Sequence, residues 1–356
     1  MKHAYGLILA GGRGTRFWPR SRRASAKQVL KFFGDRTLIQ QTVDRLRPVL
    51  PPERIWILTN DHLRAEIIRQ LPDVPKRQIL AEPAQRNTAP AIGLAAHILQ
   101  SFDPDAVMGV FPSDQVIGRP REYLRLVRPA LKAAADGKIV VLGIQPRWPE
   151  TGYGYIEFAK GVKPSAAPVE VLSFREKPDA EAARRFVDSG NFYWNAGMFF
   201  WRASVVLDGL RKFLPKTATL LASLPPFGHR RFASALDSVF SKCENISIDY
   251  ALLERASNVA GVPAGDIGWN DVGSWNAVHE LHRRDQHGNA IRADAIIEAS
   301  TGNYVEAGKK LIALLGVKDL IVVDTPDALL IADRSRAQQV GEIVKRLEKA
   351  GRTDLL

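Results

Sequence analysis

Apolar and polar residues alternate along the first half of the chain in blocks that predict strands and helices in turn. Short apolar runs predict strands at residues 4–10, 54–60, 77–81, 106–111 and 139–144. Between them, apolar residues recur at helical spacing and predict helices at residues 38–46, 61–71, 89–101 and 122–135. This order is typical of an α/β fold, with a Rossmann-like, mixed but mainly parallel sheet flanked by helices. Ligands of such sheets bind beyond the carboxyl ends of the strands, so the residues that follow each strand are the first candidates for a site.

The last quarter of the chain has a different pattern. Short β-rich segments follow one another at residues 293–298, 303–305, 311–315, 320–323 and 328–332, and an amphipathic segment at 335–347 closes the chain. We therefore expect a catalytic domain at residues 1–285 and a small β domain at 286–356, a partial β-helix with a terminal helix. This domain is expected to pack on the larger one or on a second subunit, and a homodimer is the corresponding hypothesis.

Composition and charge narrow the class of protein. With 356 residues and 46% hydrophobic residues, the chain is long enough to bury a large core. The net charge of +12 indicates an anionic partner, either a polyphosphate substrate or nucleic acid. No basic helix or RNA-binding motif stands out, so phosphate substrates are favoured; nucleic-acid binding would instead show strongly salt-dependent affinity. Cys243 is the only cysteine, which excludes an intrachain disulfide and suits the cytoplasm, and we expect no membrane span.

The loop after the first strand combines glycines with cations, as phosphate sites do. Glycines at residues 11–14 let the backbone approach an anion, and Arg13, Arg16 and Lys27 can neutralise its charge. A Rossmann fingerprint would open directly into a helix, whereas more loop follows here, and the Gly-Lys-Ser/Thr of a Walker A loop is absent. A strand-to-helix turn with solvated arginines is the structural alternative.

Carboxylates follow later strands. Glu82 opens the segment after the third strand and offers an acceptor for the N1–H and amino donors of a guanine edge, whereas Asn87 or Thr88 suits a helix cap. Asp114 follows the fourth strand, and a carboxylate there suits Mg²⁺ in a chain that binds triphosphate. Its structural alternative is a turn or cap residue.

Several later motifs also have purely structural alternatives. Residues 151–156 are typical of a hairpin turn that leads into a strand. Glu176 and Lys177 are consistent with an ordinary ion pair on the surface. Asn195 lies in an aromatic strand and should be hydrogen-bonded there. Residues 247–254 look like a capped helix, with Ser247 or Asp249 as the cap.

Together these motifs resemble the sugar-phosphate nucleotidyltransferases, and within them the mannose-1-phosphate guanylyltransferases. The motifs are LILAGGRGTRFWP at 7–19, Lys27-Gln28, EPAQRNTAPA at 82–91, FPSD at 111–114, TGYGY at 151–155, FREKP at 174–178, YWNAG at 193–197, SIDYALLE at 247–254 and WNDVGSW at 269–275. Two positions depart from the family pattern. Ala26 stands where the family has proline, and Gln115 stands where it has histidine.

The resemblance implies a GT-A-like nucleotidyltransferase that converts GTP and mannose 1-phosphate to GDP-mannose and pyrophosphate, with Mg²⁺ or another divalent cation as cofactor. The implied catalytic residues are Arg16, Lys27 and Lys177. The implied nucleotide-binding residues are Leu9, Ala10, Gly11, Gly12, Arg13, Gly14, Thr15, Glu82, Asn87, Thr88 and Ser113. The implied sugar-binding residues are Tyr153, Gly154, Glu176 and Asn195, and the implied metal ligands are Asp114 and Asp271.

Some alternatives stay open at this point. Another sugar-1-phosphate nucleotidyltransferase, for heptose or glucose 1-phosphate, is the nearest one. A non-catalytic regulator that binds GDP-mannose is another. Asp249 and Glu254 match the family pattern but have no assigned role. The chain has no room for the isomerase domain fused to some relatives, so we expect no isomerase activity.

Overall fold

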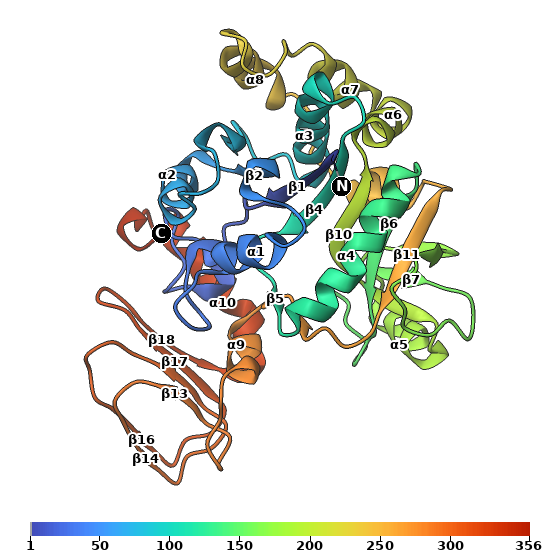
Figure 1. The fold of residues 1–356 in the computed structure, drawn as a ribbon. Coiled ribbons are helices and arrows are strands. Elements are labelled where there is room, and N and C mark those ends of the chain that lie inside the picture. The colour runs from blue at the N-terminus through green and yellow to red at the C-terminus, as the bar shows by residue number, and fades with distance from the viewer. Residues whose placement is uncertain (1) are drawn as a thin grey trace.

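The computed structural model describes residues 2–356 and contains one large mixed sheet with helices on both faces (Figure 1). Along the sheet the strands are β3 (Ile79–Ala81), β2 (Ile55–Thr59), β1 (Ala4–Leu9), β4 (Val107–Pro112), β10 (Phe192–Arg202), β6 (Ile139–Ile144), β11 (Val259–Ala264) and β8 (Val169–Glu170). β7 (Tyr155–Glu157) pairs with β10 and with β9 (Ser173–Arg175). β10 is antiparallel to both neighbours, whereas β1, β2, β3 and β4 are parallel. The predicted fold class is thereby confirmed.

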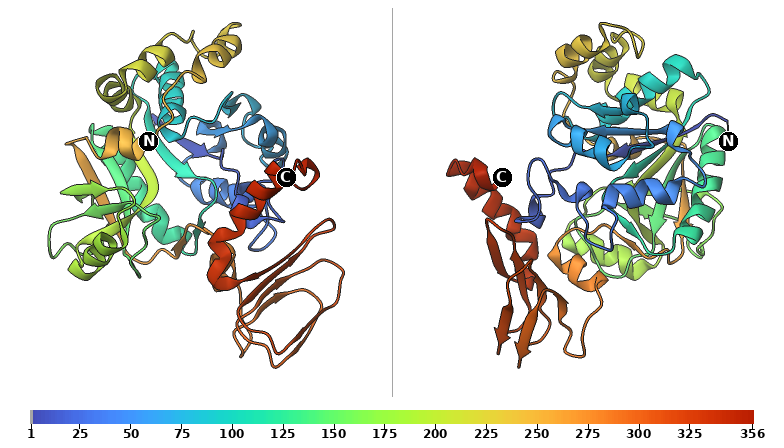
Figure 2. Two further views of the ribbon diagram at one scale, coloured as in Figure 1. Left: turned by 180° about the vertical axis from the view of Figure 1, so that it is seen from behind. Right: turned by 60° about the vertical axis from the view of Figure 1, so that its left-hand side comes forward.

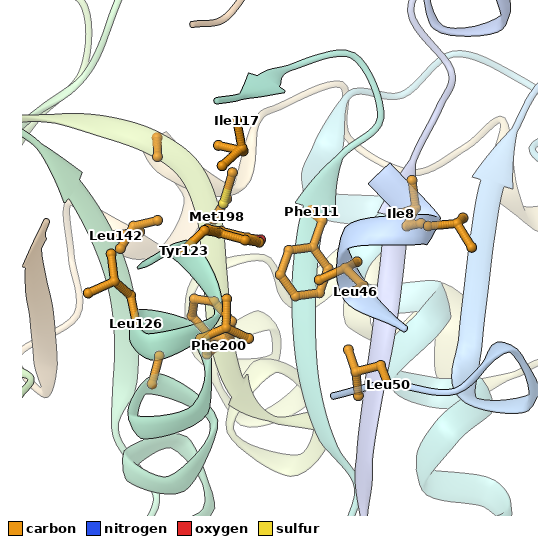
Figure 3. Packing of buried hydrophobic residues seen from close by; sticks show 14 of the residues in the cluster. Ile8, Leu46, Leu50, Phe111, Ile117, Tyr123, Leu126, Leu142, Met198 and Phe200 are labelled. Carbon is orange, nitrogen blue, oxygen red and sulfur yellow. The ribbon is translucent and has the colours of Figure 1, made fainter. Parts of the chain in front are cut away.

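Two hydrophobic clusters hold the helices to opposite faces of this sheet. α1 (Leu38–Leu46), α2 (Asp61–Gln70), α4 (Pro120–Ala135) and α5 (Ala180–Ser189) pack on one face. α3 (Thr88–Phe102), α6 (Ala203–Phe213), α7 (Pro215–Ala222) and α8 (Phe232–Phe240) pack on the other. Successive strand residues alternate between the faces, since Ile8 belongs to the first cluster and Leu7 to the second. Figure 3 shows Ile8, Phe111 and Phe200 pointing into the first cluster.

The C-terminal unit is a short β-helix. β13 (Ala290–Arg292), β15 (Tyr304–Glu306) and β17 (Leu320–Asp324) pair in parallel, and β18 (Leu329–Asp333) adds antiparallel to β17. β14 (Ala295–Glu298) and β16 (Ile312–Leu315) form a second parallel sheet, so each coil contributes one strand to each sheet. The predicted partial β-helix is confirmed. β13 was not predicted, and the division at residue 285 stays a prediction.

The β-helix packs on the large unit of the same chain through an aromatic cluster. The Phe17 and Trp275 rings lie 5.4 Å apart, and the Trp275 and Tyr304 rings 5.5 Å apart. Trp275 begins α9 (Trp275–Leu281), which leads into the β-helix. The terminal helix α10 (Val340–Lys349), reached through the 3₁₀ turn Arg334–Gln339, returns to the N-terminal loops (Figure 2). Val340 adds to the cluster. The expectation that this unit packs on the larger one is confirmed.

No helix within residues 2–356 is both long and apolar enough to cross a bilayer. Two smaller elements matter for the site. β5 (Val116–Ile117) pairs with β12 (Trp269–Asn270), which brings the WNDVGSW motif beside the loop after β4. A π-helical turn at Asp249–Leu253 lies against α6.

Candidate active site

The candidate site lies where the strand order of the sheet reverses. β2 and β3 extend the sheet on one side of β1, and β4 lies on its other side. β1 and β4 are parallel, with Leu9 opposite Pro112, so the loops that follow them leave the sheet side by side. Such a reversal is the usual ligand site of an open α/β sheet. The fold therefore brings the glycine-rich loop next to Asp114.

The glycine-rich loop has its carbonyl groups held by the protein. Gln28 Nε2, buried beneath the loop, donates to the carbonyls of Ala10 at 2.7 Å and Gly12 at 3.0 Å. Ser21 Oγ donates to the carbonyl of Arg13 at 2.9 Å. In the described part of the chain, no hydrogen bond uses the N–H groups of the four residues after Ala10. The loop thus keeps donors available for an anion.

Lys27 reaches the cleft from the 3₁₀ turn Lys27–Val29. Its side chain is 7% exposed, and its ammonium donates to Asp114 Oδ2 at 2.9 Å and to the main-chain oxygen of Asp271 at 2.7 Å. Gly14 has a φ of 61°, and a Cβ there would lie 2.7 Å from Cβ of Lys27, so this approach requires glycine. One ammonium thereby links the end of β4 to the distant WNDVGSW motif.

Asp114 and Asp271 line the same cavity. Within residues 2–356, no group of three or more His, Cys, Asp or Glu side chains is placed to hold a metal ion. Mg²⁺ is commonly bound by one or two carboxylates together with substrate phosphates, and this pair fits that donor set. The residues therefore suit a divalent cation that arrives with a phosphate-bearing substrate.

Backbone strain follows Asp271 directly. Val272 has a φ of 49°, which a β-branched residue rarely adopts. Asn270 Oδ1 accepts a hydrogen bond from the Val272 N–H at 2.7 Å, and the Val272 side chain is fully buried. These contacts hold the strained turn and fix the direction in which Asp271 leaves the backbone.

A neighbouring cavity contains the residues expected to read the base. Glu82, Asn87 and Thr88 line it together with Leu9 and Gly11, while Gly12, Ser113 and Asp114 complete its wall. Burial raises the pKa of Glu82 to about 8. In the described residues no hydrogen bond or ion pair engages this carboxyl group. Among these residues the carboxyl group is therefore unpaired, and burial favours its protonated form.

Asn87 and Thr88 also serve the structure. The Asn87 side chain accepts from the N–H of Thr88 at 2.9 Å and caps α3, as the structural alternative predicted. Asn87 has a φ of 64°. Thr88 Oγ1 accepts from the N–H of Ile248 at 2.9 Å, which joins the start of α3 to the segment before Asp249.

The sugar-side motifs converge on the first cavity, which Tyr153, Gly154, Glu176, Lys177 and Asn195 line together. A Cβ on Gly154 would lie 2.5 Å from Glu176 Oε2, so a larger residue there would displace this carboxylate. Lys177 Nζ lies 3.1 Å from Glu176 Oε1, and burial raises the pKa of Glu176. Burial and the nearby Asp271 carboxylate raise the pKa of Tyr153. Both residues line the cavity, with the Glu176 side chain 8% exposed and the Lys177 side chain 55% exposed, so the pair lies at the edge of the cavity and the surface.

The prediction of a capped helix at residues 247–254 is wrong. The segment forms a π-helical turn without a side-chain cap, because Asp249 turns toward β10 and accepts from Asn195 Nδ2 at 3.0 Å. Asn195 is thus hydrogen-bonded within the protein, as its apolar strand requires. Burial, followed by the charge of Glu176, raises the pKa of Asp249 to about 7. Glu254 Oε1 accepts from the main-chain N–H of Glu176 at 3.1 Å and supports it.

Comparison with known proteins gives a consistent result. Residues 5–288 match the nucleotidyl transferase family, and residues 294–347 match the mannose-phosphate isomerase/GMP-like β-helix domain. The xanthan biosynthesis protein XanB of Xanthomonas campestris pv. campestris (strain ATCC 33913) is 40% identical over 98% of this chain and 74% of its own. The mannose-1-phosphate guanylyltransferase of Escherichia coli K12 is 40% identical with the same coverage. A Thermus thermophilus crystal structure, described as a mannose-1-phosphate geranyltransferase, has a TM-score of 0.85 at 33% identity, covering 97% of this chain and 99% of the other.

The chain belongs to the mannose-1-phosphate guanylyltransferase family. It is a nucleotidyltransferase, and this family generally uses a divalent metal ion. The roles of its individual site residues stay predictions.

In this nucleotidyltransferase, the two loop arginines point to different places. Arg16 lines the cavity with Lys27 and Asp271, and its Nη1 donates to Gln338 Oε1 at 2.7 Å. Arg13 pairs with Glu348 of α10, and with Thr15 it lines another cavity, which shares Glu82 with the cavity of Gly11 and Gly12. Arg13 and Thr15 thus do not line the cavity of Lys27 and Asp271. Ala10 is buried beneath the loop.

Two supporting residues of the family site were not predicted. Gln115, which replaces the family histidine, donates to the carbonyl of Ala196 at 2.8 Å and accepts from Trp269 Nε1 at 2.9 Å. It ties β10 and β12 to the loop of Asp114. Arg45 is buried on α1, and burial lowers its pKa to about 10, while the Asp114 charge acts in the opposite direction. The sequence showed that Gln115 departs from the family pattern, but it gave no sign of the role of Arg45.

Proposed function

We propose that this protein transfers a guanylyl group from GTP to mannose 1-phosphate and releases pyrophosphate. The observation that supports this most is a pair of adjoining cavities at the strand reversal, both of which Asp114 lines. Gly11 and Gly12 of the glycine-rich loop line one of them, and Lys27 and Asp271 line the other. Donors, cation and carboxylates together are what a triphosphate with its metal ion requires.

The chemistry needs no covalent intermediate with the protein. A phosphate oxygen of the sugar phosphate attacks the α-phosphorus of GTP in line, and a new P–O bond forms. The bond between the α-phosphorus and the bridging oxygen breaks, and its electron pair leaves with pyrophosphate. The protein accelerates this step by positioning both phosphates and stabilising the charge that develops on them.

The charged residues divide this work by position. Arg16 and the amides of the loop would hold the β- and γ-phosphates, and Lys27, already in the cleft, would stabilise charge at the α-phosphate. Lys177 would bind the sugar phosphate. Asp114 and Asp271 would hold a divalent cation, Mg²⁺ in our proposal, which screens the charge of the reacting phosphates.

Recognition of the two substrates uses opposite ends of the cleft. Glu82 lies in the cavity next to the loop, where its carboxylate would accept from guanine N1–H and the amino group. Glu176, Asn195 and Tyr153 line the other end, where mannose hydroxyls would lie.

Pyrophosphate release tests the proposal. Purified protein with Mg²⁺ is assayed with GTP, ATP, UTP and dTTP against mannose, glucose and heptose 1-phosphates. We expect release with GTP and mannose 1-phosphate. A different preferred pair would keep the mechanism and change the substrates. Absence of release from every pair, with folded protein that binds GDP-mannose, would leave the regulator as the better hypothesis.

A further inference from the structure

The C-terminal unit reaches into the wall of the cleft. Ser335 and Gln338, from the 3₁₀ turn that precedes α10, line one cavity together with Arg16, Tyr153 and Asp271. The same turn contacts Thr15–Phe17, the 3₁₀ turn that follows the glycine-rich loop and lies far from Gln338 in sequence. This cavity adjoins the one that Lys27 and Asp114 line, because Arg16, Tyr153 and Asp271 line both.

The partners of the two loop arginines differ in charge. Arg13 pairs with the Glu348 carboxylate, which neutralises it. Arg16 donates one N–H to the side-chain oxygen of Gln338, a neutral acceptor. A guanidinium has five N–H donors, so a single bond to an amide orients Arg16 without cancelling its charge.

The turn that carries Gln338 is itself fixed to the large unit. Asn276 Nδ2 donates to the carbonyl of Arg334 at 2.7 Å, and Arg334 Nε donates back to Asn276 Oδ1 at 3.2 Å. At the other end of the turn, Gly341 has no side chain, and a Cβ there would lie 3.4 Å from Thr15 Oγ1 and 3.8 Å from Arg16 Cγ. Gln338 is thus held at a set distance from Arg16.

We propose that Gln338 is a positioning residue, which aims the Arg16 guanidinium at the phosphates of the nucleotide while leaving its charge available. This inference rests on the proposed function, because it needs a triphosphate in the cleft. It makes the β-helix unit part of the phosphate site. The unit would then contribute to turnover as well as to stability.

Binding of inorganic pyrophosphate tests this without turnover. Isothermal titration with Mg²⁺ present compares the wild type with Gln338→Met, which keeps the length of the side chain and removes the acceptor. We expect Gln338→Met to bind pyrophosphate about tenfold more weakly than the wild type, since the charged Arg16 loses its hydrogen bond to the side chain at position 338. Gln338→Glu keeps the acceptor but neutralises Arg16, so binding should weaken further.

Gln339→Met is the matched control. Gln339 lies in the same turn, is exposed, and accepts from Arg336 Nε at 2.9 Å on the surface. The Gln339→Met variant should bind pyrophosphate as tightly as the wild type does.

The turnover assay adds a second readout. Gln338→Met should raise the KM for GTP and leave the KM for mannose 1-phosphate unchanged.

Several results would overturn the inference. Tighter pyrophosphate binding by Gln338→Met would mean that Gln338 competes with phosphate for Arg16. Equal binding by the Gln338 and Gln339 variants would mean that Gln338 does not position Arg16. An equal rise of both KM values with a lower melting temperature would mean a structural role only. A wild type that binds pyrophosphate but releases none from any substrate pair would contradict the proposed function alone.

Discussion

The two ends of the cleft hold their carboxyl groups in different electrostatic states. At the end proposed for the reaction, Asp114 already accepts from Lys27 at 2.9 Å, so both charges are compensated before a ligand arrives. At the end proposed to bind the base, Glu82 is half-buried and has no such partner among residues 2–356, and burial raises its pKa to about 8. The proposed reaction end is therefore organised in advance, whereas burial favours the protonated form of the carboxyl group at the proposed base end. An ion pair formed in advance favours a high reaction rate, whereas a carboxyl group with a raised pKa makes nucleotide binding depend on pH.

Removal of the ammonium at the reaction end should give the largest effect. We expect Lys27→Met to lower kcat by about 10²- to 10³-fold, because one preorganised electrostatic contact to the reacting phosphates is lost. The KM for GTP should change much less. Pyrophosphate release at saturating substrates measures the effect.

Lys31→Met is the matched control for this variant, since Lys31 is exposed and lies four residues further along the same loop. Normal turnover by Lys27→Met would mean that Lys27 only neutralises the charge of Asp114 and does not take part in catalysis. Lys27→Arg adds a test of geometry, because a planar guanidinium does not reproduce the position of an ammonium.

The metal ligands should give the next largest effect. A chelator should abolish turnover, and excess Mg²⁺ should restore it. Asp271→Asn should lower turnover by about 10²-fold at a fixed Mg²⁺ concentration, with partial recovery as Mg²⁺ is raised, because one charged ligand is missing. Asp266→Asn is the control, since Asp266 is exposed and pairs with Arg119. An unchanged Mg²⁺ requirement in Asp271→Asn would exclude Asp271 from the metal site.

The sequence predicted β1, β2, β4 and β6 of the large sheet because a largely buried apolar run marks each of them. The short strands β8 and β9 have no such run. It also indicated that the residues after Leu9 and Pro112 would lie side by side, because both follow strands of a mainly parallel sheet; their roles stay predictions. It could not predict the conformation of Val272, since a β-branched residue gives no sign that it will adopt a positive φ. The neighbouring Asn270 bond and the burial of Val272 impose that conformation.

Other features depend on contacts between distant segments. The polar residue Asp249 suited a helix cap, but tertiary packing directs it to Asn195 instead. Gln338 reads as an ordinary polar residue before a helix, and only the docking of the β-helix places it on Arg16. Such pairings lie 54 and 322 residues apart in the chain, so no local pattern reports them.

The base end should respond to a change at Glu82. If its carboxylate accepts from guanine, Glu82→Gln should weaken GTP binding by about 10- to 100-fold at pH 8, as expected for loss of hydrogen bonds to a charged group. The wild type should prefer GTP to ITP, which lacks the amino group, and the variant should not. Titration calorimetry with both nucleotides measures this.

The pH dependence at Glu82 follows from its raised pKa. Below about pH 8 the free carboxyl group holds a proton that guanine binding must remove, so GTP affinity of the wild type should rise with pH up to about 8 and then level. In Glu82→Gln this rise of GTP affinity with pH should be absent.

The free energy of unfolding of the wild type should fall as the pH rises, opposite to the trend of its GTP affinity. The unfolded chain releases the proton above pH 4.5, so the wild type should lose stability relative to Glu82→Gln between pH 4.5 and about 8. An identical pH profile for the two proteins would contradict this account.

The smallest effect is expected at Asp249, which combines features of both ends. Like Glu82 it is half-buried, and burial raises its pKa to about 7, yet it already accepts a hydrogen bond from Asn195. As the pH rises from 6 to 8, its ionised form should accept a sugar hydroxyl together with Glu176, and the KM for mannose 1-phosphate should fall by up to about tenfold. In Asp249→Asn the KM for mannose 1-phosphate should not fall in this way.

Because the sugar phosphate itself titrates, the quantity to compare is the ratio of variant to wild-type KM at each pH. Asp237→Asn, on the surface of α8, should keep a constant ratio. A constant ratio for Asp249→Asn as well would mean that Asp249 acts only as an acceptor for Asn195, and that the base end alone senses pH.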